Sequence, residues 1–236
     1  MTAACALERD GFALVRGVVS AGLIARTIAA FATADVSRSK RSEETYGARN
    51  ILDVAEVREL ASLDTVRAFV SDALDGEPLV VRGIFFDKTP AANWPVAWHQ
   101  DLSLALAARQ ETDGWQAWSV KAAVVHVQPP ADVLGRMVTL RFHLDACSED
   151  NGPLRVVPGS HAHGRLDRER QASLRAQVNE QSLCVAAGDV IAMRPLIMHA
   201  SSAARSPHHR RIVHLEFAPR DLLPPGLAWN ASSFAL

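Results

Sequence analysis

Several features that define common protein classes are scarce in this sequence. Only three cysteines occur in 236 residues, and they form no CxxC pair, so neither a disulfide framework nor a zinc ribbon is predicted. No apolar run approaches the roughly 18 residues that a membrane span requires. The N-terminus carries Glu8, Arg9 and Asp10 where a signal peptide needs apolar residues. We therefore expect a cytoplasmic protein with no membrane partner.

Charge of one sign is also lacking. The chain has 25 Lys and Arg against 26 Asp and Glu, a formal net charge of -1. This balance gives no electrostatic reason to expect nucleic acid as a partner. No GxSxG, GxxxxGK[ST] or GxGxxG motif is present, so a serine hydrolase or a nucleotide-binding fold is not indicated. The 48% hydrophobic content is enough for a core without disulfide or metal staples.

Helical and β patterns occupy different parts of the chain. A first strand over residues 11–19 is followed by Ser20 as a helix cap and a helix over 21–34, and the polar residues 37–46 predict a loop. From residue 79 onward, short apolar segments alternate with Pro and Gly turns. These predicted strands are 79–86, 120–127, 138–144, 184–186, 190–193 and 212–217. The order favours a mainly β fold with flanking helices, a jelly roll buttressed by N-terminal helices.

No internal repeat or low-complexity tract divides the chain, so we expect one domain over residues 1–236. Its predicted parts are an N-terminal strand and helices (1–78), a jelly-roll core (79–219) and a C-terminal tail (220–236).

A His-x-Asp pair lies in the segment WPVAWHQDL. If this segment ends a strand, His99 and Asp101 project from the same face while Gln100 points away. Together with His199, which follows an apolar β segment, they make the 2-His-1-carboxylate triad of non-haem Fe(II) oxygenases. The pair alone is more typical of a surface histidine beside an aspartate than of a metal site. The later histidine favours a metal site.

A candidate anion partner lies on the last predicted strand, RRIVHLEF. Arg210, Ile212, His214 and Glu216 share one strand face, and the apolar set beginning with Val213 shares the other. The polar face should look into the barrel. Arginine binds a carboxylate bidentately and stays charged, so Arg210 suits the distal carboxylate of 2-oxoglutarate, whose keto-acid end would chelate the iron.

The strand MVTLRFHL shows the same alternation. Val138, Leu140 and Phe142 form an apolar face, whereas Arg141 and His143 lie on a polar face with Thr139. A polar face in mid-domain has to be wet, either at the surface or in a site filled with water. Arg141 and His143 are therefore candidate substrate residues.

Three further residues have two interpretations each. His126 either lines the same pocket or packs in the core, and Trp98 either stacks on substrate or fills the core. Lys88, at a predicted strand end, is either a solvated charge or a pocket cation, and the first is favoured.

Four separated motifs now point to one family. WHQDL, EDNGPLRVVPGSH, AGDVIAMRPLIMHASS and RRIVHLEFAP occur in this order, and together they resemble the phytanoyl-CoA dioxygenase family over about residues 79 to 219. The resemblance implies a double-stranded β-helix, the cupin-like form of the jelly roll. It also implies Fe(II), 2-oxoglutarate and O2, with hydroxylation of an unactivated carbon in a small-molecule substrate and release of succinate and CO2.

Carried over by motif position, the resemblance implies co-substrate contacts for Ser201, Gln100 and Arg49 as well as Arg210. One departure concerns Arg141, because some members place a tryptophan against the co-substrate there. A more polar pocket is expected, which argues against a fatty acyl-CoA substrate. Asp101 argues against halogenation, since related halogenases have a small residue at that position.

Two other functions are compatible with the same residues. One is a different metal-dependent β-barrel enzyme, an isomerase or a hydrolase, and the other is a non-catalytic binding module on the same fold. Arg210 discriminates against the first, because such enzymes need no partner for a distant carboxylate. The intact triad argues against the second.

Overall fold

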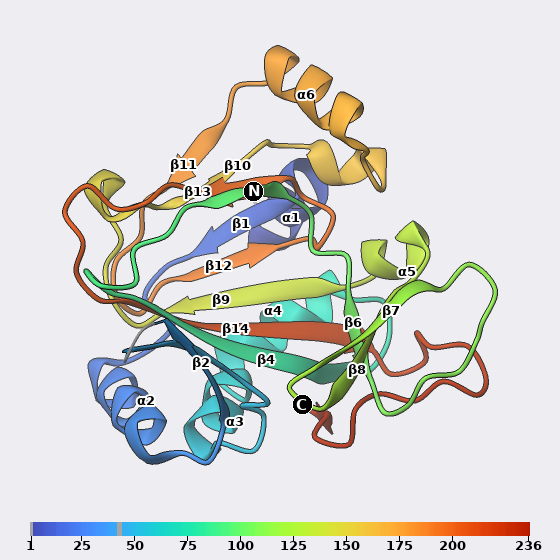
Figure 1. Cartoon of the computed structure of the whole chain (residues 1–236), viewed down its shortest axis with the longest axis horizontal. Helices are drawn as coiled ribbons and strands as arrows, with labels where there is room; N and C mark the ends of the chain where they lie inside the picture. The colour runs from blue at the N-terminus through green and yellow to red at the C-terminus, as the bar shows by residue number, and fades with distance from the viewer. Residues whose placement is uncertain (1, 42–43) are drawn as a thin grey trace.

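The computed structural model describes residues 2–41 and 44–236 and is built around two antiparallel sheets (Figure 1). The large sheet has eight strands among these residues. In order across the sheet they are β1 (Phe12–Val15), β12 (Val190–Met193), β9 (Val138–His143), β14 (Arg210–Pro219), β4 (Pro78–Lys88), β3 (Glu44–Arg49) and β2 (Ser37–Arg41), with β15 (Phe234–Ala235) also paired to β4.

A smaller sheet lies above the large one in Figure 1. Its strands, in order, are β11 (Gln181–Leu183), β10 (Leu154–Val156), β13 (His199–Ser201) and β5 (Val96–His99). A third sheet of β6 (Leu104–Leu106), β8 (Val124–Gln128) and β7 (Gln116–Lys121) lies at one end of the pair. Two facing antiparallel sheets make the predicted jelly roll.

Helices cover the outer face of the large sheet, and Figure 1 shows α2 and α3 on the side opposite β10 and β13. The helices are α1 (Ala3–Asp10), α2 (Ala21–Thr33), α3 (Ala55–Ala61), α4 (Asp64–Ala73), α5 (Ala131–Gly135) and α6 (Arg168–Gln177), with short 3-10 turns at Glu149–Asn151 and Ser160–His163. None of the helices described is long and apolar enough to cross a membrane.

The main core lies between these helices and one face of the strands. Leu140, Phe142, Val213 and Leu215 project from β9 and β14 and are fully buried. They meet the apolar faces of α1 to α4, whose buried members are Leu7, Leu23, Phe31, Val57, Leu60, Val66, Phe69 and Val70. Because side chains alternate along a strand, the other face of β9 and β14 looks toward the small sheet.

Local signals explain some boundaries. The Ser20 side chain accepts a hydrogen bond from the Leu23 backbone N–H, so α2 begins where the cap was predicted. The predicted loop over 37–46 is wrong where it is described, because β2 and β3 pair there; residues 42 and 43 lie outside the described part of the chain. The strand predicted over 120–127 is a hairpin, which turns at Ala122 and Ala123 with positive φ at both.

The strand predicted over 184–186 is displaced. β11 ends at Leu183, and beyond it only Val185 forms a bridge, with Cys147. Gly188 and Asp189 turn the chain there, so the pairing with the small sheet is lost before the segment enters β12.

Candidate metal centre and co-substrate pocket

Three predicted ligands meet between the sheets. His99 ends β5 and His199 opens β13, and the two are paired across these strands, with ring centroids 4.2 Å apart. Asp101 follows two residues after His99. Its Oδ1 is 3.8 Å from His99 Nε2 and its Oδ2 is 3.8 Å from His199 Nε2. The three ligand atoms lie within 4.8 Å of one another, which is close enough for one cation to contact all three.

Hydrogen bonds fix the direction of both imidazoles. His99 Nδ1 donates to the Ala97 carbonyl at 2.8 Å, and His199 Nδ1 donates to the Ile197 carbonyl at 3.0 Å. Each Nε2 is therefore left with a lone pair directed at Asp101. A backbone carbonyl on the far ring nitrogen is a common second contact of metal-binding histidine.

Asp101 itself supports a metal site. Its Oδ2 is buried and has no hydrogen-bond partner among the described residues, which is costly for a carboxylate unless a cation binds there. Burial alone would raise the pKa of Asp101, but the nearby His199, His214 and His99 hold it below its usual value. Burial lowers the pKa of His199. An anionic carboxylate and neutral imidazoles are the protonation states that bind a divalent metal.

A cavity of about 210 Å³ adjoins this cluster and separates the two sheets. Its large-sheet wall carries an apolar middle of Ile84, Phe86 and Ile212. Its charged lining residues are Arg82, Lys88, Arg141, Arg210 and Glu216, together with His214 and the metal cluster. The predicted orientation of the polar face of β14 is therefore observed.

Arg210 and Lys88 make a basic pair at one end of this cavity. They stand opposite each other in the β14–β4 register, and both are buried. Arg210 donates to the Asn151 carbonyl at 3.2 Å, while Lys88 Nζ lies 2.7 Å from the Trp94 carbonyl and 3.1 Å from Ser201 Oγ. Among the described residues neither cation has a carboxylate partner. An incoming carboxylate would find two cations and a hydroxyl together.

Lys88 is the residue that the sequence interpretation undervalued. Burial, with Arg210 and Arg141 nearby, lowers the pKa of Lys88 to about 7. The available signal was strand parity, because Lys88 lies on the same face of β4 as Arg82, Ile84 and Phe86.

A second polar group lines the wall nearer the metal cluster. Arg141 donates from Nη1 to His214 Nδ1 at 3.1 Å, and Glu216 accepts from Arg82 at 3.0 Å. Glu216 Oε1 is also 3.5 Å from His214 Nε2. These four side chains form a continuous row across β9, β14 and β4.

Gln100 and Trp98 do not line the cavity in the described structure. Gln100 donates to the Gly164 and Leu196 carbonyls and accepts from the Leu166 N–H, so its amide holds a loop in place. Trp98 packs beneath α6 with Arg175 and Arg155 over its ring, at 4.7 and 5.3 Å. This placement does not support the predicted contacts of Gln100 with co-substrate or of Trp98 with substrate.

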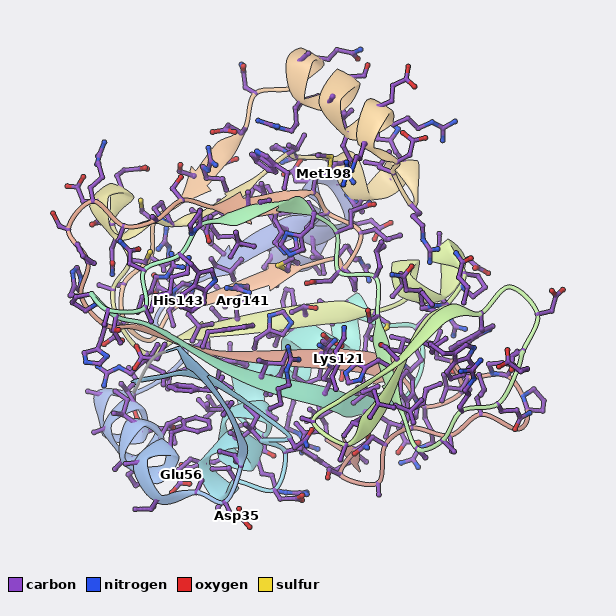
Figure 2. All side chains as sticks on the ribbon, in the orientation of Figure 1. Asp35, Glu56, Lys121, Arg141, His143 and Met198 are labelled. Atoms are coloured by element: carbon purple, nitrogen blue, oxygen red, sulfur yellow. The ribbon has the colours of Figure 1, made fainter. Side chains whose placement is uncertain are left out.

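Three other predicted residues, His143, His126 and Arg49, are not among the lining residues of this cavity. Figure 2 labels His143 beside Arg141 along β9. His143 is buried, neither ring nitrogen has a hydrogen-bond partner among the described residues, and burial with Arg141 and Arg210 lowers its pKa to about 3. His126 and Arg49 line a smaller adjoining hollow, which shares Arg82 with the main cavity. Burial lowers the pKa of His126 to about 4.

The fold is of the cupin-like, double-stranded β-helix type, and the cluster offers three ligand atoms that could hold one metal ion. The chain belongs to the phytanoyl-CoA dioxygenase (PhyH) family, whose model matches residues 7–212. None of the curated proteins matches the sequence.

Solved structures share the fold. EctD from S. alaskensis, determined with 2-oxoglutarate and 5-hydroxyectoine, has a TM-score of 0.69 at 20% identity, covering 92% of this chain and 74% of its own. The epimerase SnoN, determined with Fe3+, alpha ketoglutarate and nogalamycin RO, has a TM-score of 0.68 at 18% identity, covering 98% and 85%. AviO1 from Streptomyces viridochromogenes Tue57 has a TM-score of 0.64 at 22% identity, covering 94% and 96%. Iron and 2-oxoglutarate, both predicted here, are present in structures of EctD and SnoN.

Proposed function

We propose that this protein is an Fe(II)- and 2-oxoglutarate-dependent oxygenase that hydroxylates an unactivated carbon of a small molecule. The observation that carries the proposal is the pairing of two sites in one cavity. An unpartnered Asp101 carboxylate faces two Nε2 lone pairs, and an end of the cavity holds Arg210 and Lys88 without a carboxylate among the described residues. A ligand set for a metal next to a receptor for a distant carboxylate fits a chelating keto-diacid.

Each residue then has a specific task. His99, Asp101 and His199 hold the iron, with the carbonyls of Ala97 and Ile197 fixing the imidazole orientation. Arg210 and Lys88 bind the distal carboxylate of 2-oxoglutarate, and Ser201 donates its hydroxyl proton to it. Iron with 2-oxoglutarate and O2 supplies the oxidising chemistry, in which 2-oxoglutarate gives succinate and CO2. The protein supplies binding, orientation and exclusion of water.

Hydroxylation is the simplest outcome of that chemistry, but the family resemblance does not restrict the product. Two proteins with similar structures are an epimerase, SnoN, and a carbocyclase, SnoK. The substrate is expected to be small, because the cavity of about 210 Å³ also has to hold the co-substrate. Product analysis by mass decides among the three, since hydroxylation adds one oxygen, epimerisation leaves the mass unchanged and ring closure by oxidation removes two hydrogens.

The class itself is tested by titrating Fe(II) and 2-oxoglutarate into the protein under nitrogen. A metal-to-ligand charge-transfer band should form with one equivalent of each, and succinate should appear when O2 is admitted. The matched variant is Arg210→Met, which keeps the metal ligands and should shift the band to much higher 2-oxoglutarate concentrations. A protein that binds Fe(II) but gives no band and no succinate at saturating 2-oxoglutarate would be a different metalloenzyme.

A further inference from the structure

We infer that Arg141 is the receptor for a carboxylate on the substrate, so that the substrate is a small acid with an apolar body. This inference rests on the proposed function and names the substrate class of the same cavity. Arg141 projects from β9 into the cavity near the metal cluster. Figure 2 labels Arg141 at β9 in the large sheet.

The first observation is that Arg141 forms no ion pair with a carboxylate among the described residues. No carboxylate among the described residues lies within ion-pair distance of its guanidinium, and its buried Nε has no hydrogen-bond partner. Its one described hydrogen bond goes to His214 Nδ1, at 3.1 Å. That nitrogen has to accept, because a guanidinium only donates. The contact satisfies one N–H and leaves the guanidinium without an ion pair, because the Asp101 carboxylate of the metal cluster acts on it only from beyond ion-pair distance.

The second observation is that Glu216 does not pair with Arg141. Glu216 lies on the same strand face and could have been the structural partner of Arg141. Instead Glu216 accepts from Arg82 at 3.0 Å, and His214 stands between Glu216 and Arg141. The row therefore orients the guanidinium without neutralising it.

The third observation concerns the co-substrate. Arg141 is level with His214 in the β9–β14 register, four residues along β14 from Arg210, and the positive charges of the two guanidinium groups repel each other. The end formed by Arg210, Lys88 and Ser201 already offers two cations to one distal carboxylate. A divalent iron is balanced by Asp101 and the chelating carboxylate of the co-substrate. Once the iron and 2-oxoglutarate are bound, Arg141 remains a cation in a partly desolvated cavity, which is costly without an anion.

The residues around Arg141 indicate the character of the rest of the substrate. Its guanidinium carbon is 5.8 Å from the centre of the Phe86 ring, and Ile84 and Ile212 lie on the same wall. An acid whose carbon chain lies on this apolar middle would bring a C–H bond to the metal cluster while its carboxylate meets Arg141. A neutral molecule of the same shape would leave the arginine unpaired.

The experiment measures binding, not turnover. The protein is saturated with Fe(II) and 2-oxoglutarate under nitrogen, and linear monocarboxylates from butanoate to heptanoate are titrated by calorimetry against the primary amides of equal length. At least one acid should bind about tenfold more tightly than its amide. In Arg141→Met that acid should bind about 30-fold or more weakly, while amide affinity and 2-oxoglutarate affinity change little. Arg141→Lys should recover part of the preference.

Arg155→Met is the matched control, because Arg155 pairs with Glu180 on the outer side of the small sheet. It should bind the acid as the wild-type protein does. The inference is overturned if no acid binds more tightly than its amide, or if Arg141→Met keeps the preference. It is also overturned if this variant loses 2-oxoglutarate affinity as strongly as acid affinity, which would assign Arg141 to the co-substrate. Failure of the proposed function is a separate result, the absence of the charge-transfer band from the wild-type protein.

Discussion

Strands β9, β14 and β4 have two faces of opposite character. Leu215 and Glu216 are neighbours in β14, and both are buried, with 0% and 5% of their surface exposed. Leu215 packs against the helices, whereas Glu216 lines the cavity. At this pair of neighbours burial is thus deep on both faces, but the helix side is apolar and the cavity side collects polar groups. Burial alone does not separate structural residues from functional ones; the side of the strand does.

The two faces also differ in their energetic effect. The helix-side face buries apolar surface and stabilises the fold. The cavity-side face holds polar atoms with no hydrogen-bond partner among the described residues: Thr139 Oγ1, both ring nitrogens of His143, and Nε of Arg141 and Arg210. Each such atom costs free energy unless water or a ligand satisfies it. The helix-side face therefore offsets the cost of keeping a ligand site ready.

The largest expected effect tests the cavity side. Asp101→Ala should abolish iron retention and turnover, because it removes the only carboxylate of the metal cluster. The free energy of unfolding of the metal-free protein should change by less than about 1 kcal/mol, since the lost oxygen Oδ2 had no hydrogen bond. Iron stoichiometry and urea unfolding measure the two quantities. Full iron content in this variant would contradict the assignment of the cluster.

The opposite result is expected on the helix side. Leu215→Ala should lower the free energy of unfolding by about 2–5 kcal/mol, because the side chain is fully buried among the core residues. Its affinity for 2-oxoglutarate should stay close to that of the wild-type protein. Urea unfolding and calorimetry measure both. If this variant lost 2-oxoglutarate binding while keeping its stability, the separation of the two faces would be wrong.

Adjacent arginines give the sharpest form of the comparison. Arg210→Met should weaken 2-oxoglutarate binding by about 2–5 kcal/mol, because a carboxylate would be left without its buried partner. Arg211→Met should leave binding unchanged, since Arg211 pairs with Asp145 on the other face at 2.6 and 2.8 Å. It should cost at most about 1 kcal/mol of stability, because that pair is partly exposed. Calorimetric titration distinguishes them, and reversed effects would mean a different strand register.

The smallest effect is a pH dependence. Burial and the neighbouring Arg210 and Arg141 lower the pKa of Lys88 to about 7, so Lys88 loses its charge between pH 6 and 8.5 in the ligand-free protein. A carboxylate favours the charged form, and 2-oxoglutarate affinity should fall roughly tenfold as the pH rises through this window. The slope should flatten in Lys88→Met. An equally steep slope in that variant would assign the titration to another group.

Strand periodicity predicted most of what carries the proposal. The alternation of RRIVHLEF and MVTLRFHL assigned Arg210 and Arg141 to the inner face, and the structure places both on the cavity wall. These predictions depended only on the pleat of one strand. The cap at Ser20 was equally local.

What the sequence could not show depends on contacts between distant segments. Gln100 was expected beside the co-substrate, but its amide forms hydrogen bonds with Gly164, Leu166 and Leu196, which are distant in the sequence. Helix α6 has no buried residue, so its sequence resembles a solvated face. The contact of its Arg175 with the Trp98 ring could therefore not be predicted from the sequence. Strand parity alone assigns Lys88 to the cavity face of β4, but its place beside Arg210 depends on the β4–β14 register.

The metal ligands and the co-substrate cations belong to different sheets. His99 and His199 stand on the small sheet, whereas Arg210 and Lys88 stand on the large one. A molecule held at both ends would add a link between two layers whose apolar side chains also pack together, among them Phe12 and Ile191 of the large sheet and Leu154 and Val156 of the small one. By mass action, a free concentration a hundredfold above its Kd would add about 2.7 kcal/mol to the free energy of unfolding. The stability of this protein would then depend on the concentration of 2-oxoglutarate. A cell short of 2-oxoglutarate would contain a less stable protein as well as an inactive one.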